Sequence, residues 1–123
     1  MIEEDYVSFE TAKLLKEKGF DDKNVIPNFG FNVYEPINGR LIHNNPPGAI
    51  KSPTLQMAMK WLRKEKGIAI IPIISSILDN EKFLWDVKVV VAKTSETYSQ
   101  GWIYEEPERA YEAAIKYCLE NLI

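Results

Sequence analysis

Three features of this chain contain residues of the types that catalyse reactions or bind metals in other proteins: one histidine, one cysteine and a cluster of glutamates. His43 lies in a polar, proline-rich stretch, and a general base there needs a nucleophile and an orienting acid that the sequence does not reveal. We therefore interpret His43 as a solvated loop residue. Cys118 falls on the apolar stripe of a predicted C-terminal helix, where a cysteine usually serves as a small buried side chain with an unreactive thiol.

The acidic cluster has a structural explanation. Glu105, Glu106 and Glu108 lie at the start of the predicted last helix, where the helix dipole favours negative charge. One cysteine and one histidine cannot supply the nitrogen and sulfur ligands of a zinc site. None of the six glycines has the spacing of a dinucleotide-binding or P-loop motif. The sequence predicts no catalytic, metal-binding or cofactor-binding residues, and we do not predict an enzyme.

A basic helix is the strongest functional signal. The segment from Lys51 to Lys66 carries five bases and one acid, a net charge of +4, with a tryptophan that offers a stacking surface. The alternative function that we predict is therefore a nucleic-acid-binding module that uses this basic helix. Its contact residues would be Lys60, Trp61, Arg63 and Lys64.

The rest of the charge distribution disfavours nucleic acid. The chain has a net charge of −3, and residues 79–123 hold nine acids and five bases, a net of −4. The predicted order of helix, three strands and helix matches double-stranded RNA-binding domains, which contact phosphates across the RNA groove. In this chain the final helix begins with glutamates, which would repel phosphates. A basic helix end also complements the helix dipole without any ligand.

The N-terminal third predicts one helix and a hairpin. A helix is expected over Ser8 to Lys18, with Ser8 as the N-cap, a left-handed stop at Gly19 and Phe20 folding back on Leu15. Strands Phe31 to Ile37 and Arg40 to Asn44 flank Asn38-Gly39, which favours a two-residue turn with positive φ at both positions. Pro36 should shorten the first strand or confine it to an edge.

The second helix has clear end signals. We expect Ser52 as its N-cap, Pro53 at its first position and a stop at Gly67. Its buried stripe has helical spacing. The stripe residues are Leu55, Ala58, Met59 and Leu62.

Three strands should follow. Ile68 to Ile74 is an apolar run that predicts a buried strand, although Pro72 counts against a central position. Phe83 to Lys93 alternates strictly, with Trp85, Val87 and Val89 on one face, and is expected to be central. Gly101 to Tyr104 is expected as a short third strand after the polar loop Thr94 to Gln100.

The last helix completes the predicted fold. Pro107 opens it, and a stripe at helical spacing should face the sheet: Tyr111, Ala114, Ile115, Cys118 and Leu122. We predict an α+β fold in which an antiparallel sheet of three to five strands packs against two or three helices, with the core order α-β-β-β-α. At 123 residues we expect a single domain over 1–123, with a helix, hairpin and loop region in 1–51 and the α-β-β-β-α unit in 52–123.

An uncovered sheet face favours binding as the mode of action. If the helices cover one face, then Leu84, Val90 and Ala92 on the other face need a cover from the early helix, the hairpin or a second copy. Tryptophans at three positions and six tyrosines are side chains that anchor interfaces. We therefore predict a protein-binding or self-associating module.

Three blocks of sequence point to a family. They are VSFETAKLLKEKGF, SPTLQMAMKWLRKEKGIAI and YEEPERAYEAAIKYCLENLI. Together they resemble a family of small uncharacterised proteins encoded by phages and prophages of gut bacteria of the Bacteroidales type. Where that family commonly carries a histidine, this chain has Lys66-Gly67. The resemblance implies an accessory protein in the cytoplasm of a bacterial host and no site residues. The acidic, polar N-terminus and the lack of a long apolar run predict no signal peptide and no membrane partner.

Overall fold

The computed structural model describes residues 5–20, 31–44, 46–80, 82–99 and 101–123. Its contacts divide the chain into two compact units, Met1–Ala58 and Met59–Ile123, so the division falls inside the second helix and not at residue 52. The single domain over 1–123 stays a prediction.

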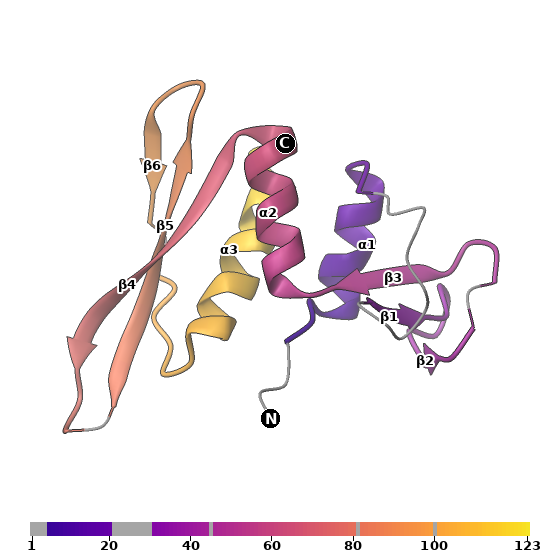
Figure 1. The fold of residues 1–123 in the computed structure, drawn as a ribbon, viewed down its shortest axis with the longest axis horizontal. Coiled ribbons are helices and arrows are strands. Elements are labelled where there is room, and N and C mark those ends of the chain that lie inside the picture. The colour runs from indigo at the N-terminus through magenta and orange to yellow at the C-terminus, as the bar shows by residue number, and fades with distance from the viewer. Residues whose placement is uncertain (1–4, 21–30, 45, 81, 100) are drawn as a thin grey trace. The chain divides into compact units, whose positions relative to one another are not determined.

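The described residues form three helices and six strands (Figure 1). In chain order these are α1 (Phe9–Glu17), β1 (Phe31–Tyr34), β2 (Leu41–Ile42), β3 (Ile50–Pro53), α2 (Leu55–Lys66), β4 (Ile68–Ile77), β5 (Phe83–Val91), β6 (Glu96–Tyr98) and α3 (Pro107–Asn121). The strands form two antiparallel sheets with the orders β2-β1-β3 and β4-β5-β6. The predicted α+β class is confirmed, with the strands divided between two sheets. None of the helices in the described residues is long and apolar enough to cross a membrane.

Helix α1 begins and ends as its sequence predicts. The Ser8 hydroxyl accepts a hydrogen bond from the Thr11 N–H at 3.2 Å. Gly19 has a φ of +99°, and the Phe20 N–H donates to the Leu15 carbonyl at 2.9 Å, which closes the C-terminus. The helix buries Thr11, Ala12 and Leu15.

The β1–β2 hairpin forms, but the predicted two-residue turn is wrong. The Glu35 N–H donates to the Arg40 carbonyl at 2.8 Å, and the Gly39 N–H donates to the Glu35 carbonyl at 2.9 Å. Residues 36–39 therefore make a four-residue loop, in which Gly39 has positive φ and Asn38 does not. Pro36 explains this, because its ring holds φ near −65° and β1 already ends at Tyr34.

The predicted start of the second helix is also wrong. Ser52 and Pro53 belong to β3, where they pair with Asn32 and Phe31 of β1. The Ser52 hydroxyl is buried and donates to the Val7 carbonyl, so it does not cap the helix. Thr54 takes that role, since its Oγ1 accepts from the Met57 N–H at 3.2 Å.

In the second unit, β5 is the central strand, as predicted. Val87 and Val89 are fully buried on one face of this strand. Tyr98 of β6 lies opposite Val89, and its ring is 6.1 Å from the ring of Tyr117 in α3. Helix α3 therefore covers the face that holds Val87 and Val89. The helix buries Ala110, Ala114, Ile115, Cys118 and Leu119.

The third strand lies earlier than predicted. Strand β6 is Glu96–Tyr98, inside the expected polar loop, and Ser95 turns the chain with a φ of +60°. The Ser95 N–H donates to the Val91 carbonyl at 2.8 Å, and Thr94 Oγ1 accepts from the Glu96 N–H at 3.3 Å. These local bonds make a tight turn between β5 and β6. The polar composition of this segment had predicted a loop without a strand. The predicted strand Gly101 to Tyr104 is reduced to one bridge between Tyr104 and Trp85.

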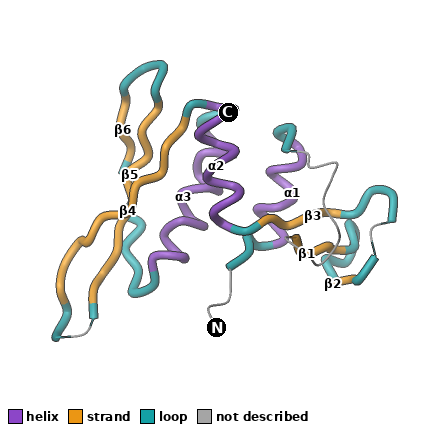
Figure 2. Tube along the Cα trace, viewed as in Figure 1, coloured by secondary structure: helices purple, strands orange, loops and turns teal. Residues whose placement is uncertain are grey.

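Strand β4 is longer and more exposed than predicted. It runs for 10 residues at one edge of its sheet, which agrees with Pro72, but Ile68 is its only fully buried residue. The far half of the β4–β5 pair, at the end of β4 and the start of β5, extends past the N-terminal end of α3 (Figures 1 and 2). A helix of 15 residues is about 22 Å long, whereas 10 strand residues span about 33 Å, so α3 cannot cover the whole of β4.

Candidate functional site

The far end of the β4–β5 pair carries several exposed apolar side chains of the second unit. We call it the ribbon end and define it as Ile74, Ile77, Leu78, Phe83 and Trp85. The first four are 49, 70, 47 and 39% exposed, and Trp85 is half-buried. Such exposed apolar clusters mark interaction sites more often than isolated surface residues do.

The strand register places four members of the ribbon end on the face that α3 covers: Ile74, Ile77, Phe83 and Trp85. Ile77 lies opposite Phe83, and Ile74 lies opposite Trp85. Trp85 and Val87 are two residues apart on one strand, so they point to the same face. One apolar face therefore continues from the buried core near Val87 to the exposed ribbon end.

Local bonds hold the ribbon end in shape. The rings of Phe83 and Trp85 meet edge to face at a centroid distance of 6.1 Å. Trp85 exchanges two backbone hydrogen bonds with Tyr104, at 2.7 and 2.9 Å, and the Leu78 N–H donates to the Lys82 carbonyl at 2.9 Å. A binding partner would meet a surface that is already formed.

The opposite face of this sheet is mixed in character. The sequence predicted that Leu84, Val90 and Ala92 would need a cover, and the structure shows the first two half-buried and Ala92 exposed. Asp86 and Lys88 share that face, so it is less apolar than the ribbon end. Sequence reasoning missed the ribbon end because it gave β4 seven residues. The structure continues the strand to Ser76 and Ile77, which pair with Leu84 and Phe83. The isoleucine at position 77 was the one sign in the sequence that the strand could be longer.

The predicted nucleic-acid residues all lie on α2. Lys60, Arg63 and Lys64 are exposed, and Trp61 is half-buried. The Lys66 ammonium lies 5.5 Å from the centre of the Trp61 ring, a cation–π distance. The helix thus exposes basic side chains, but a lysine already lies over the ring that a base would use for stacking.

The remaining residues considered for catalysis or metal binding are His43, the glutamates before α3 and Cys118. His43 is exposed, and so are Glu105 and Glu106. Cys118 is fully buried, and burial raises the pKa of its thiol to about 12. Within the ranges that the structure describes, no three His, Cys, Asp or Glu side chains are grouped to hold a metal ion.

Two tyrosines also have shifted titrations. The Tyr98 hydroxyl donates to Glu96 Oε2 at 2.6 Å, and this hydrogen bond to a carboxylate raises the pKa of Tyr98. Burial raises the pKa of Tyr111. Both shifts keep the phenols neutral, so neither tyrosine is prepared to act as a base.

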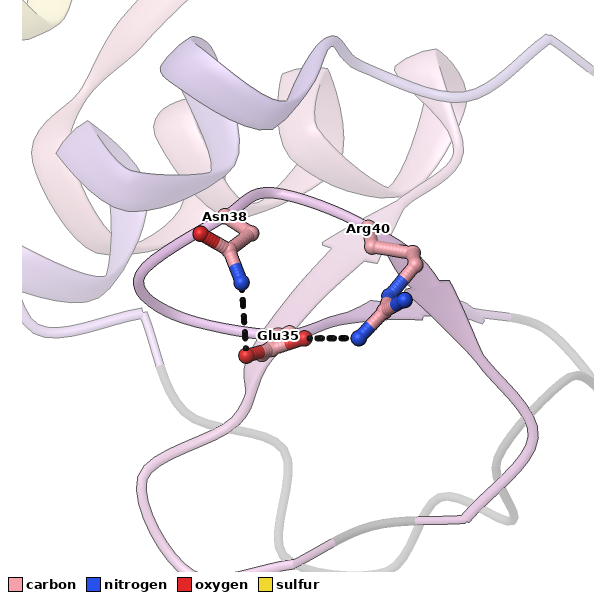
Figure 3. Close-up of polar contacts among 3 residues, drawn as sticks. All are labelled: Glu35, Asn38 and Arg40. Atoms are coloured by element: carbon pink, nitrogen blue, oxygen red, sulfur yellow. Dashed lines mark hydrogen bonds and ion pairs between the residues drawn. The ribbon is translucent and has the colours of Figure 1, made fainter.

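A polar network shapes the β1–β2 loop of the first unit (Figure 3). The Glu35 carboxylate accepts from Asn38 Nδ2 and from Arg40 Nη2, each at 3.1 Å. This loop displays Ile37, which is 87% exposed. A single exposed isoleucine is ordinary on a protein surface and is not by itself a site.

Comparison of the chain with family models, with curated proteins and with solved structures found no match.

Proposed function

We propose that this chain is a phage- or prophage-type accessory protein that acts in the bacterial cytoplasm by binding protein, either a partner or a second copy of itself. One observation carries the binding proposal: the apolar face under α3 continues into the exposed ribbon end. The three sequence blocks that resemble phage and prophage proteins support the setting. No enzyme activity is part of the proposal.

The ribbon end contains enough apolar surface to drive a moderate association. Full burial of an isoleucine, leucine or phenylalanine side chain contributes about 1.5–3 kcal/mol. The four exposed members are 39–70% exposed, so roughly half of this free energy is gained only when another protein surface covers them. A two-stranded ribbon is only marginally stable in water on its own, so a cover would also stabilise the ribbon.

Sedimentation velocity tests self-association. If a second copy binds, the native chain will sediment as a mixture of monomer and dimer at roughly micromolar concentrations. Ile77→Lys should return it to monomer because the substitution places a charge in the interface. Ile37→Lys is the control, since it makes the same substitution at another exposed isoleucine, which lies outside the ribbon end.

Photocrosslinking tests a partner protein if the native chain is monomeric. A photoreactive residue at position 77 should give crosslinked products in a bacterial host, and the same residue at position 37 should not. A monomer that crosslinks no more at 77 than at 37 would contradict the proposal.

The second candidate is nucleic-acid binding by α2. It is favoured by the exposure of Lys60, Arg63 and Lys64 along one helix. Changing all three to glutamate should abolish retention of a labelled duplex at low salt. The control changes Lys82, Lys88 and Lys93, which are also exposed, and alters the net charge by the same amount. Absence of retention by the native chain, or equal loss in both triple variants, removes this candidate.

A further inference from the structure

Strand β4 leaves one edge of its sheet open. In the described part of the chain, β5 is its only partner strand. The stretch from Gly67 to Leu78 has no charged residue and contains six isoleucines. A long apolar edge of this kind is a template for adding a strand from another chain.

The register shows which backbone groups point to the open edge. The Ala92 N–H donates to the Gly67 carbonyl at 2.9 Å, so the pair 67/92 is a hydrogen-bonded pair. Such pairs alternate along antiparallel strands, so Ala69, Ile71 and Ile73 direct their backbone groups toward β5. Ile68, Ile70, Pro72 and Ile74 direct theirs toward the open edge.

The far side of β5 agrees with this alternation. Trp85, the partner of Ile74, bonds through both backbone groups to Tyr104 and not to β4. The backbone groups of Ile74 therefore also point away from β5.

Pro72 occupies one of these four edge-facing positions, between Ile70 and Ile74. Because it lacks an N–H and lies opposite Val87 in a pair without hydrogen bonds, it costs the ladder with β5 nothing. On the open side it removes one N–H donor and puts a ring where a second strand would lie. The register also shifts between Ile74 and Ser76, and a bulge there bends the exposed edge.

We infer that Pro72, helped by this bulge, blocks strand addition at β4. A partner of the ribbon end must then pack on the sheet face and cannot extend the sheet. The inference concerns the edge alone and holds whether or not the ribbon end binds protein.

Restoring the missing donor tests the inference. Pro72→Val and Pro72→Thr both supply an N–H at the open edge, one with an apolar and one with a polar side chain. Each should raise the self-association constant measured by sedimentation velocity roughly tenfold or more, because a two-fold pairing gains hydrogen bonds in both copies. Pro47→Val, at an exposed proline outside the strands, should change nothing.

A double variant separates the donor from other effects of removing proline. Pro72→Val combined with Ile74→Pro moves the block to another edge-facing position and should associate no more than the native chain. Unchanged association in both single variants would overturn the inference. Equal association of the double variant and Pro72→Val would overturn it as well.

Discussion

Gly39 lies directly against the ring of Phe9, so that a Cβ added at Gly39 would be 2.9 Å from two ring carbons. This contact joins the β1–β2 loop to helix α1 in the first unit. It depends on a residue with positive φ and no side chain.

Gly39→Ala should therefore destabilise the first unit by about 1–3 kcal/mol, through strain at positive φ and displacement of the ring. The measurement is urea unfolding followed by circular dichroism. Gly48→Ala is the matched control, because Gly48 also has positive φ but nothing within 4 Å of the added carbon. Equal losses in the two variants would show that the contact with Phe9 contributes nothing.

Thr54→Val should lower stability by about 0.5–2 kcal/mol, because it removes the oxygen that accepts from the Met57 N–H at the start of α2. Valine has nearly the same shape, so packing is little changed. Thr54→Ser keeps the acceptor and should recover most of the loss in the same urea titration. A serine variant as unstable as the valine variant would argue against capping.

The ribbon end should contribute little to the stability of the free chain. Ile77→Ala should change the unfolding free energy by less than about 0.5 kcal/mol, because Ile77 is 70% exposed. Val87→Ala on the neighbouring strand should lose about 2–4 kcal/mol, since Val87 is fully buried. Thermal unfolding of the two variants at low concentration compares them. Similar losses would mean that Ile77 is part of the core.

The buried thiol of Cys118 should make stability depend on alkaline pH. Its folded pKa of about 12 lies above the ordinary value of 9.0, so between these values the unfolded chain binds fewer protons than the folded chain. The stabilising effect is complete below pH 9 and is lost as the pH rises toward 12, by about 1.4 kcal/mol per pH unit.

Urea titrations at pH 8 and pH 10 measure this slope. Cys118→Ala is the control variant, because it keeps all other groups that titrate between pH 8 and pH 10. The difference in pH dependence between the native chain and the variant therefore reports the contribution of the thiol. The folded native chain should also react slowly with a thiol reagent at pH 8 and rapidly in urea. Fast reaction without urea would show that Cys118 is accessible.

Local signals predicted most of the elements. The caps of α1, the proline at the start of α3 and the alternation in β5 each depend on a few neighbouring residues, and each prediction is confirmed. The start of α2 could not be read in this way. Ser52 and Pro53 suit a helix start, but pairing with Phe31 and Asn32 far away in sequence places them in a strand.

The candidate site depends on a length that sequence patterns do not fix. The isoleucine run stops at Ile74, and Ser75 with Ser76 looks like a turn, yet the strand continues through a bulge to Ile77. Burial was therefore predicted for residues that α3 does not reach. Which face of a strand is covered follows from alternation, but how far the cover extends follows from packing in three dimensions.

The bridge between Tyr104 and Trp85 marks a change in the width of the second sheet. Val89 to Val91 pair with β4 on one side and with β6 on the other, whereas Leu84 and Phe83, beyond the bridge, pair with β4 alone. The second sheet is therefore only two strands wide at the ribbon end. A protein that covers the ribbon end would therefore also hold β4 and β5 together where no third strand is paired with them.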